Sequence, residues 1–359
     1  MALTKITADV VVDNTITEPK LATTGTASSA TTLHGNDTWG TVASSGLLNL
    51  AADPGTGQTA GNTWYLSGLV NFVADTNNIA GIWVSAANTL LAKRYAASCG
   101  IQSAMLSVGG LAGSGLTNTA EKFDGGVWNS TTVFPATARH WTMFGSESAA
   151  TTVSGELGGS NSAVSYEFDG TTWVVAGSIS SVRTSAGCTG TQTAGLCWGG
   201  VGGTGSNLSE EYNGTSWSAT GNYVASPWDC HGGGKQSAAF GVGGNTPPSI
   251  NTTGEYDGST WSAGGNSIKA VSEMGVGGTQ TAGLMVAGYT SSPSESIKST
   301  EEYDGTTWAS ASDILGTARR TVDPGAGSQG AGIMSNGYIS DFTNETELYD
   351  KTTIEFVAV

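Results

Sequence analysis

A tryptophan recurs every 44 to 47 residues through almost the whole chain of 359 residues. A second series keeps the same register and follows each tryptophan by 19 residues, except the last, which follows by 21. Two independent markers that hold one register over seven intervals identify a repeat protein. A period near 45 residues is typical of small sheets arranged in a closed ring. The first series is Trp39, Trp83, Trp128, Trp173, Trp217, Trp261 and Trp308, with Ile354 in the eighth slot, and the second is Gln58, Gln102, Glu147, Gln192, Gln236, Gln280 and Gln329.

The composition favours short strands joined by many tight turns. Charged residues make up 12% of the chain, about half the usual share, and 54 residues are glycine. Disorder is not expected, because the tryptophan-centred repeats carry enough apolar surface to pack. The 13 basic and 29 acidic residues give a net charge of −16, which argues against a nucleic-acid-binding surface.

The cysteines and the first residues of the chain indicate in which cellular compartment the protein is made. The four cysteines occupy no common repeat position and form no Cys-x-x-Cys pair, so we expect free, partly buried thiols rather than disulfides or a metal cluster. The first ten residues lack the apolar core of a signal peptide, and no apolar run is long enough to span a membrane. The cysteines are Cys99, Cys188, Cys197 and Cys230.

Each repeat contains signals for two hairpins. An Asp-Gly or Asn-Gly pair lies between an aromatic strand and the tryptophan strand, as at Asp169-Gly170 and Asp257-Gly258. Such a pair predicts a hairpin with a type I′ turn, whose two central residues have positive φ. A Gly-x-Gln turn before a short apolar stretch, such as residues 282–288, predicts the second hairpin. Four strands per repeat make one blade.

The sequence therefore predicts an all-β protein, a β-propeller of four-stranded blades. We expect seven blades over residues 46–359, six of them clearly marked, behind a short extended N-terminal arm of residues 1–45. The first repeat is the weakest, since no Gly-Gly follows its Gln58 segment. Trp39 and Ile354 both occupy the outer-strand slot, one more than seven blades need, so one of them is expected to close the ring beside the other end of the chain.

The repeat resembles the kelch repeat of galactose-oxidase-like propellers. The resemblance rests on Gly-Gly at 109–110, 199–200 and 243–244, on the following Tyr or Phe, on the tryptophan, and on an arginine ten or eleven residues after it. It covers roughly residues 46–359. The Asp-Gly-x-x-Trp turn is tighter than the kelch turn, so the repeat is a kelch-like variant. The string also resembles the Asp-box of sialidase propellers, but it is one residue short and lacks the Asp-x-Gly order.

The first 45 residues look like the low-complexity connector of bacteriophage tail fibres and other virion structural proteins. An Ile-Thr-x-x-Lys-Leu-Ala segment at 16–22 precedes Gly-Asn-Asp-Thr-Trp at 35–39. The resemblance implies a virion protein that is assembled in the host cytoplasm and needs no signal peptide. It also implies that the arm docks to other virion or tail proteins, or oligomerises there. A trimer is plausible by analogy with fibres, although no heptad pattern would drive it.

Binding is expected where the repeats differ. The repeated Trp, Tyr and Gly-Gly are interpreted as packing residues. The repeated Gln is interpreted as a residue that orders the inner hairpin turn. Alternatively, the glutamines form a ring of amides that holds an ion or a water cluster. The Asp-Gly and Gly-x-Gln turns should share one face, leaving the variable loops on the other, where aromatic rings beside hydrogen-bonding groups suit sugars. The predicted ligand-binding residues are Arg94, Arg139, His140, Trp141, Arg183, Tyr223, Trp228, Asp229 and Arg319, with His231 and Arg320 on the same face.

No catalytic residue, metal site or cofactor is predicted. Copper chemistry of the galactose-oxidase kind would need two His and two Tyr at one site, and the chain has only His34, His140 and His231. No serine has a recognisable elbow or His/Asp partners. A pair of loop carboxylates for glycoside cleavage stays open, although turn formation explains most of the acids.

The functional expectation is a phage tail-fibre or tail-associated structural protein whose propeller binds a host-surface glycan or protein receptor. Many weak sites on one particle would act by avidity. One alternative is a purely structural virion decoration or tail protein that contacts only other virion proteins. The other alternative is a polysaccharide-degrading enzyme.

Overall fold

The computed structural model describes residues 81–202, 204–321 and 325–351, together with the backbone of five strands elsewhere. The chain divides into one compact unit of residues 82–349 and another of residues 1–81 with 350–359. The predicted boundary between residues 45 and 46 lies outside the described residues, as do Trp39, Gln58 and Ile354. In the smaller unit two strands pair with each other and three form an antiparallel sheet; these are β1 (Thr15–Ile16) with β2 (Leu33–His34), and β3 (Thr63–Leu66), β4 (Val70–Ala74) and β35 (Phe356–Ala358).

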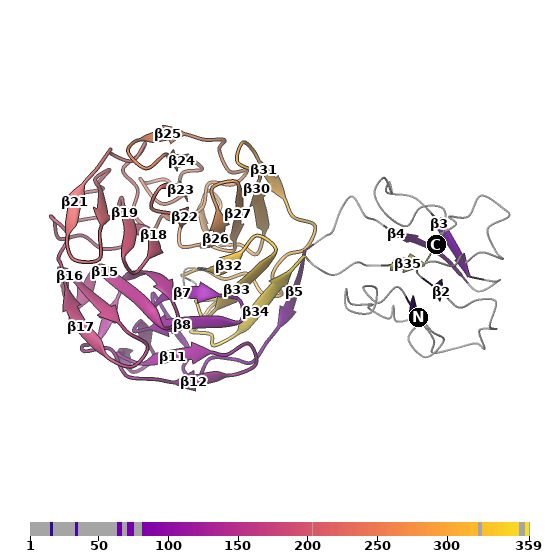
Figure 1. Cartoon of the computed structure of the whole chain (residues 1–359), viewed down its shortest axis with the longest axis horizontal. Helices are drawn as coiled ribbons and strands as arrows, with labels where there is room; N and C mark the ends of the chain where they lie inside the picture. Colours follow the sequence, from indigo (N-terminus) through magenta and orange to yellow (C-terminus); the bar gives the residue numbers. More distant parts are fainter. Residues whose placement is uncertain are drawn as a thin grey trace. The chain divides into compact units, whose positions relative to one another are not determined.

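The larger unit is an all-β, propeller-like arrangement of six antiparallel sheets around a common centre (Figure 1). Four-stranded antiparallel sheets are therefore confirmed: five of the six have four strands, and the second has a fifth, β13 (Ala138–Arg139), which pairs with β15. The number of seven blades stays a prediction, because residues 46–80 lie outside the described residues except for the backbone of two strands. From the centre outward, the first is β7 (Ala97–Ile101), β8 (Ala104–Val108), β11 (Ala120–Phe123) and β12 (Trp128–Ser130). The second is β14 (Thr142–Ser146), β15 (Ala149–Leu157), β16 (Ser160–Phe168) and β17 (Trp173–Ala176); the third is β18 (Gly187–Thr191), β19 (Ala194–Trp198), β20 (Ser209–Tyr212) and β21 (Trp217–Ala219). The fourth is β22 (His231–Lys235), β23 (Ala238–Val242), β24 (Thr253–Tyr256) and β25 (Trp261–Ala263); the fifth is β26 (Gly275–Thr279), β27 (Ala282–Val286), β30 (Thr300–Tyr303) and β31 (Trp308–Ser310).

The sixth sheet takes its outer strand from the other end of the unit. Its order is β32 (Ala326–Ser328), β33 (Ala331–Ser335), β34 (Thr346–Asp350) and β5 (Ile82–Ser85). The ring of Trp83 lies 5.0 Å from that of Tyr349, as each tryptophan lies against the aromatic residue of its own hairpin elsewhere. The prediction of seven blades counted the Trp83 strand as the end of a separate first blade. The structure uses it to cover the edge that the last sheet would otherwise expose.

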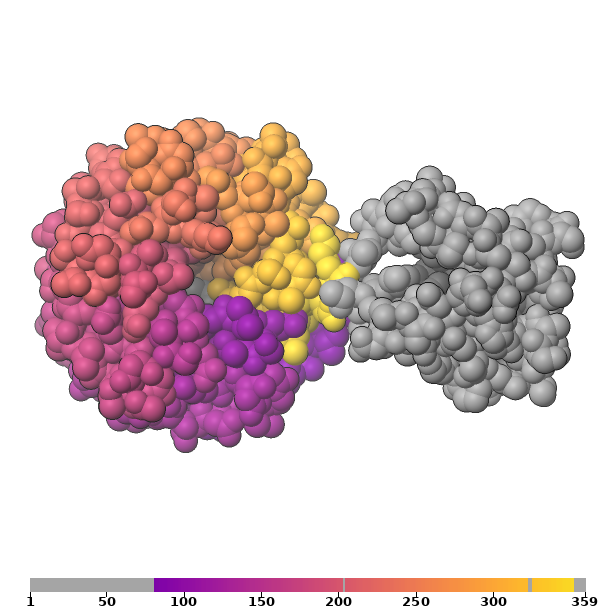
Figure 2. Space-filling model, in the orientation of Figure 1, coloured from indigo at the N-terminus to yellow at the C-terminus, as the bar shows by residue number. Residues whose placement is uncertain are grey.

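The innermost strands contact one another in sequence order, and β32 also contacts β7. The centre that they surround is hollow (Figure 2). Apolar side chains fill the spaces between neighbouring sheets, as in the cluster of Phe240, Met274 and Trp308. The packing interfaces therefore run radially between sheets rather than through one central core.

The Asp-Gly hairpins form, but their predicted type I′ geometry is wrong. Phe168 pairs with Trp173, which leaves a four-residue turn between them. In this turn Gly170 alone has a positive φ, of 95°. The Asp169 carboxylate instead accepts the backbone N–H groups of Thr171 and Thr172, at 2.8 and 2.7 Å. These bonds satisfy the turn's donors and lower the pKa of Asp169 well below its usual value.

The repeated glutamine joins neighbouring sheets rather than ordering its own turn. Gln192 Nε2 donates hydrogen bonds to the carbonyl oxygens of Ala150 and Phe168 in the preceding sheet, at 3.1 and 2.9 Å. The same pair of bonds is made by Gln102, Gln236, Gln280 and Gln329. Glu147 has no N–H to donate, and its carboxylate pairs instead with Lys122 of the preceding sheet, 3.0 Å away.

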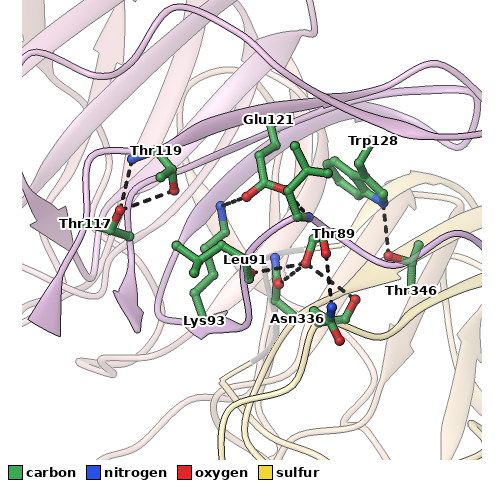
Figure 3. A network of polar contacts seen from close by, with 11 residues as sticks. Thr89, Leu91, Lys93, Thr117, Thr119, Glu121, Trp128, Asn336 and Thr346 are labelled. Carbon is green, nitrogen blue, oxygen red and sulfur yellow. Dashed lines mark hydrogen bonds and ion pairs between the residues drawn. The ribbon is translucent and has the colours of Figure 1, made fainter. Parts of the chain in front are cut away.

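Tyrosine and tryptophan add two more bonds between sheets. Tyr212 Oη donates to Glu167 of the preceding sheet at 2.9 Å, and Trp308 Nε1 donates to Thr253 Oγ1 at 2.9 Å. The tyrosine bond recurs at Tyr256, Tyr303 and Tyr349. The first and last sheets meet through the same contacts, because Trp128 Nε1 donates to Thr346 Oγ1 at 3.1 Å (Figure 3).

A buried polar network lies beside that last interface. Lys93 Nζ is 3.4 Å from Glu121 Oε1, and both side chains are almost fully buried. Thr89 Oγ1 donates to Asn336 Oδ1 at 2.6 Å (Figure 3). Comparable buried ion pairs join Arg183 to Glu210 and Arg319 to Glu347, so they fix the connections that lead into the inner strands.

Candidate functional site

Six residues with positive φ form a hydrogen-bonded ring at one end of the central cavity. Each precedes an inner strand, and their φ values lie between 51° and 58°. The backbone N–H of each donates to the carbonyl of the residue before it in the ring, and the last bond, from Tyr95 N to Thr321 O, measures 3.4 Å. Side chains rarely adopt this conformation, and such outliers often mark functional sites. The six, which we call the mouth ring, are Tyr95, His140, Ser185, Asp229, Glu273 and Thr321.

The mouth ring borders a small pocket. All six of its side chains line a cavity of about 30 Å³, together with Trp141 and His231. This volume holds one or two water-sized groups. A second cavity of about 170 Å³ lies along the inner strands, which contribute Cys99, Phe144 and many glycines to its wall.

The two faces of the larger unit differ as predicted. A Cβ added to Gly170 would lie 3.3 Å from the carbonyl oxygen of Ser148, so the Asp-Gly turn lies beside the turn that carries Glu147. These repeated turns form one face. The mouth ring and the loops after Gly-Gly form the other, where Gly110 lies close to Arg94.

Contacts link the side chains of the mouth ring. The rings of Tyr95 and His140 lie 4.0 Å apart, and His140 Nδ1 is 3.1 Å from Ser185 Oγ. Burial lowers the pKa of His140 to about 4, helped by the charge of Arg139, so the imidazole is neutral at pH 7. Burial likewise lowers the pKa of His231 to about 4.

Two carboxyl groups share this pocket. Burial raises the pKa of Asp229 to about 6, against the opposing effect of a hydrogen bond from Ser185. Burial and the charge of Asp229 raise the pKa of Glu273 to about 7, while the nearby arginines Arg94 and Arg320 lower it. Part of the Glu273 population is therefore protonated near neutral pH.

Two polar atoms of the pocket lack protein partners among the described residues. Thr321 is 3% exposed, and its Oγ1 is buried without a hydrogen bond. Glu273 Oε2 is also buried without one, because its contact with Arg320 Nε is 3.9 Å long. Buried polar atoms of this kind are costly unless water or a ligand satisfies them.

Two arginine side chains alternate with three aromatic rings beside the pocket. The Arg320 guanidinium carbon lies 4.5 Å from the ring centre of Tyr289 and 5.5 Å from that of Tyr338. Tyr338 also lies 4.6 Å from Arg94, and Phe342 lies 5.4 Å from it. These five residues are called the arginine ledge below. Arg94 lies on β6 (Lys93–Arg94) and Tyr289 on β28 (Tyr289–Ser291), two short strands outside the six sheets, and the other three residues make isolated bridges in connecting segments.

Of the predicted ligand-binding residues, the structure gathers Arg94, His140, Trp141 and Asp229 around the pocket. Trp141 is only 4% exposed and packs against Phe134, so its main contribution is to the core. These four residues lie on the face of the variable loops, where the sequence analysis expected them, and their role in binding stays a prediction.

Three other predicted residues are buried in structural contacts. Arg183 is 1% exposed and pairs with Glu210 at 3.0 Å. Arg319 is fully buried between carboxylates of the sixth sheet. Tyr223 is 2% exposed and packs edge-on against Trp261. These three side chains hold sheets together and are not displayed to a ligand.

The last two predicted residues lie away from the pocket wall. Arg139 pairs with Glu156 at 2.8 Å, on the extended β15–β16 hairpin, where β13 (Ala138–Arg139) joins β15. Trp228 is half-buried and bridges to Asn245 in the loop after Gly-Gly.

Sequence reasoning missed four members of the mouth ring, Tyr95, Ser185, Glu273 and Thr321. They share a position rather than a residue type, since each follows its tryptophan by 12 residues, or 13 for Thr321. That register could have found them beside His140 and Asp229. The aromatic residues of the arginine ledge lie in loops of unequal length and carry no such signal.

Other features of the described residues bear on alternative chemistry. The four cysteines are free, as predicted. No group of three or more His, Cys, Asp or Glu side chains in the described part of the chain is placed to hold a metal ion. The described segments are strands, turns and loops, and they contain no helix long and apolar enough to cross a membrane. A surface groove of about 370 Å³ lies between Pro248, Lys269 and Pro293.

Comparison with known proteins gives no assignment. No family model matches the chain, and no curated protein is significantly similar to it.

Proposed function

We propose that this chain is a virion structural protein of a phage tail, whose larger unit is a six-bladed, kelch-like propeller that binds a host-surface glycan or protein. The ligand would dock on the face that carries the mouth ring. The observation that supports this proposal most strongly is the pocket itself, where backbone repetition is complete but six different side chains converge. Function in repeat proteins lies where the repeats differ.

The proposed ring closure explains how such a domain can present a rigid site. Trp128 and Gln102 of the first sheet bond the sixth sheet, just as their counterparts bond each preceding sheet. Side chains on a closed ring need little reordering when a ligand binds, which preserves affinity. The kelch resemblance belongs to this proposal and rests on the Gly-Gly, Tyr and Trp positions of the repeat.

The pocket supports ligand binding rather than catalysis. Glycoside cleavage requires two carboxyl groups on opposite sides of the scissile bond. Asp229 and Glu273 instead share one cavity of about 30 Å³, which admits a hydroxyl or a water but not a sugar ring. A polysaccharide-degrading activity therefore has little support from this site.

The N-terminal residues 1–45 supply the proposed attachment to the particle. Their resemblance to tail-fibre connectors supports docking to other virion proteins, or self-association as in trimeric fibres. With several copies on one particle, weak individual sites would add up to firm attachment. A purely structural role, with contacts only to virion neighbours, is the second candidate.

The test uses the full chain and a panel of bacterial cells and purified surface polysaccharides. Retention on cells without release of reducing ends is the expected result. Release of reducing ends would overturn the non-enzymatic assignment. Capture by virion proteins alone, with no retention by any cell or polysaccharide, would replace the proposal with the structural role.

A further inference from the structure

Arg94 differs from the other arginines described here in having no carboxylate partner. Arg139, Arg183 and Arg319 each lie 2.8–3.0 Å from a glutamate oxygen. Arg320 has a longer contact of 3.9 Å with Glu273. No hydrogen bond or ion pair of the Arg94 guanidinium occurs among the described residues, and its Nε is buried without a partner. In a chain of net charge −16, an unpaired half-buried guanidinium is unusual.

Three aromatic rings hold this guanidinium in place. Its carbon lies 5.0 Å from the ring centre of Tyr95, 4.6 Å from that of Tyr338 and 5.4 Å from that of Phe342. Stacking against ring faces fixes the plane of a guanidinium and leaves its N–H edge to form hydrogen bonds. That edge matches a carboxylate, which can accept two parallel bonds. Arg94 is thus oriented for an anion before any ligand arrives.

The neighbouring pocket limits how much negative charge a ligand can bring. Glu273 lies close enough to Arg94 and to Asp229 for both charges to act on its pKa. A ligand with several clustered anionic groups would meet repulsion from both carboxyl groups. Hydroxyl groups would be accepted, because Glu273 Oε2 and Thr321 Oγ1 both lack protein partners among the described residues.

We propose that the arginine ledge and the mouth pocket together bind one acidic sugar residue of a surface polysaccharide. The sugar carboxylate pairs with Arg94, and a hydroxyl group of the same residue enters the pocket beside Thr321 and Glu273. The apolar C–H groups of the sugar lie along the rings of the ledge. Uronic acids and sialic acids have this combination of one carboxylate with several hydroxyls. This inference rests on the proposed function and names its ligand class.

The test measures binding of the full chain to defined saccharides by calorimetry. The probes are oligomers of glucuronate, galacturonate and sialate, each beside the same oligomer with its carboxyl groups reduced to alcohols. The acidic form of at least one is expected to bind about 10-fold more tightly than its reduced form, because charge-assisted hydrogen bonds are lost on reduction. Equal binding of the two forms, or no binding of any acidic probe, would overturn the proposal.

Two variants test whether the preference for the acidic saccharide depends on the arginine ledge. Arg94→Met keeps an unbranched side chain against the rings and should abolish the preference for the acidic form. Lys298→Met removes an exposed cation outside the proposed site, and should leave the preference unchanged. Thermal unfolding of each variant shows whether it is folded. An unchanged preference in folded Arg94→Met would contradict the assignment, as would tighter binding of an oligoglutamate peptide than of any sugar.

Failure of this inference can be told apart from failure of the proposed function. If the unmodified chain and Arg94→Met are both retained equally on cells, the receptor-binding role survives and the acidic-sugar site does not. If neither is retained on any cell or polysaccharide, both proposals fail together.

Discussion

The two ends of the central cavity are built from the same repeat and end in different chemistry. At the turn end, five of six sheets place a glutamine in the same slot and use it for the same two bonds to the preceding sheet. At the mouth, six residues repeat a backbone conformation and a backbone hydrogen bond but share no side chain. Repeated side chains therefore stabilise the ring of sheets. The repeated backbone conformation at the mouth instead brings six different side chains to one pocket.

Among the repeated side chains, substitution of the tryptophan should have the largest effect on stability. Trp308 is 7% exposed, packs in the cluster with Phe240, and donates to Thr253. Trp308→Ala is expected to lower the free energy of unfolding by about 3–5 kcal/mol, since it leaves a large cavity. Denaturant unfolding measures this. A loss below about 0.5 kcal/mol would mean that the tryptophan does not hold neighbouring sheets together.

The glutamine slot should show the next effect. Gln236→Leu keeps the side-chain size but removes both bonds to the third sheet, to Gly195 and Tyr212, and is expected to cost about 1–3 kcal/mol. Glu147→Leu is the matched control, because that slot makes a partly exposed ion pair with Lys122 instead of the two glutamine bonds. Such pairs contribute about 0–1 kcal/mol. Equal losses in the two variants would contradict the role assigned to the glutamine.

At the mouth, the expected effect depends on pH. Burial raises the pKa of Glu273 to about 7, so the folded protein binds this proton more tightly than the unfolded chain does. The contribution of Glu273 to stability should therefore fall by roughly 1–3 kcal/mol as the pH rises from about 4.5 to 7. His140 and His231 contribute in the opposite direction, because burial lowers their pKa values. Glu273→Gln should remove that fall, as measured by unfolding at several pH values. The exposed Glu295→Gln is the control, and an identical pH slope in the Glu273 variant and the unmodified chain would contradict the burial argument.

The fold could be predicted from the sequence because the packing residues repeat. The tryptophan and glutamine registers, with the Asp-Gly hairpins, predicted an all-β protein of four-stranded sheets, and this is confirmed. The pairing of β5 with β34 could not be read from the period, because a period does not tell which end of the chain supplies the outer strand beside Tyr349. The turn type was wrong because the Asp169 carboxylate binds the turn's N–H groups, which a dipeptide signal does not reveal.

The site was predicted only in part. Arg94, His140 and Asp229 were placed on the correct face, because the loops that carry them vary between repeats. Arg183 looked equally available, yet its partner Glu210 comes from a distant position on β20, where a glutamate stands two residues before the tyrosine. The mouth ring itself is defined by φ rather than by residue type, so only its constant spacing from the repeated tryptophan could mark it in the sequence.

The central claim is that ligands bind at the mouth and not at the turn face. The most direct measurement compares cell retention of two folded variants of the full chain. One carries Arg94→Met with Tyr338→Ala in the arginine ledge, and the other carries Ser237→Arg with Thr281→Arg on exposed turns of the opposite face. We expect at least about 10-fold weaker retention for the ledge variant and no change for the turn variant. Loss of retention in the turn variant alone would contradict the central claim.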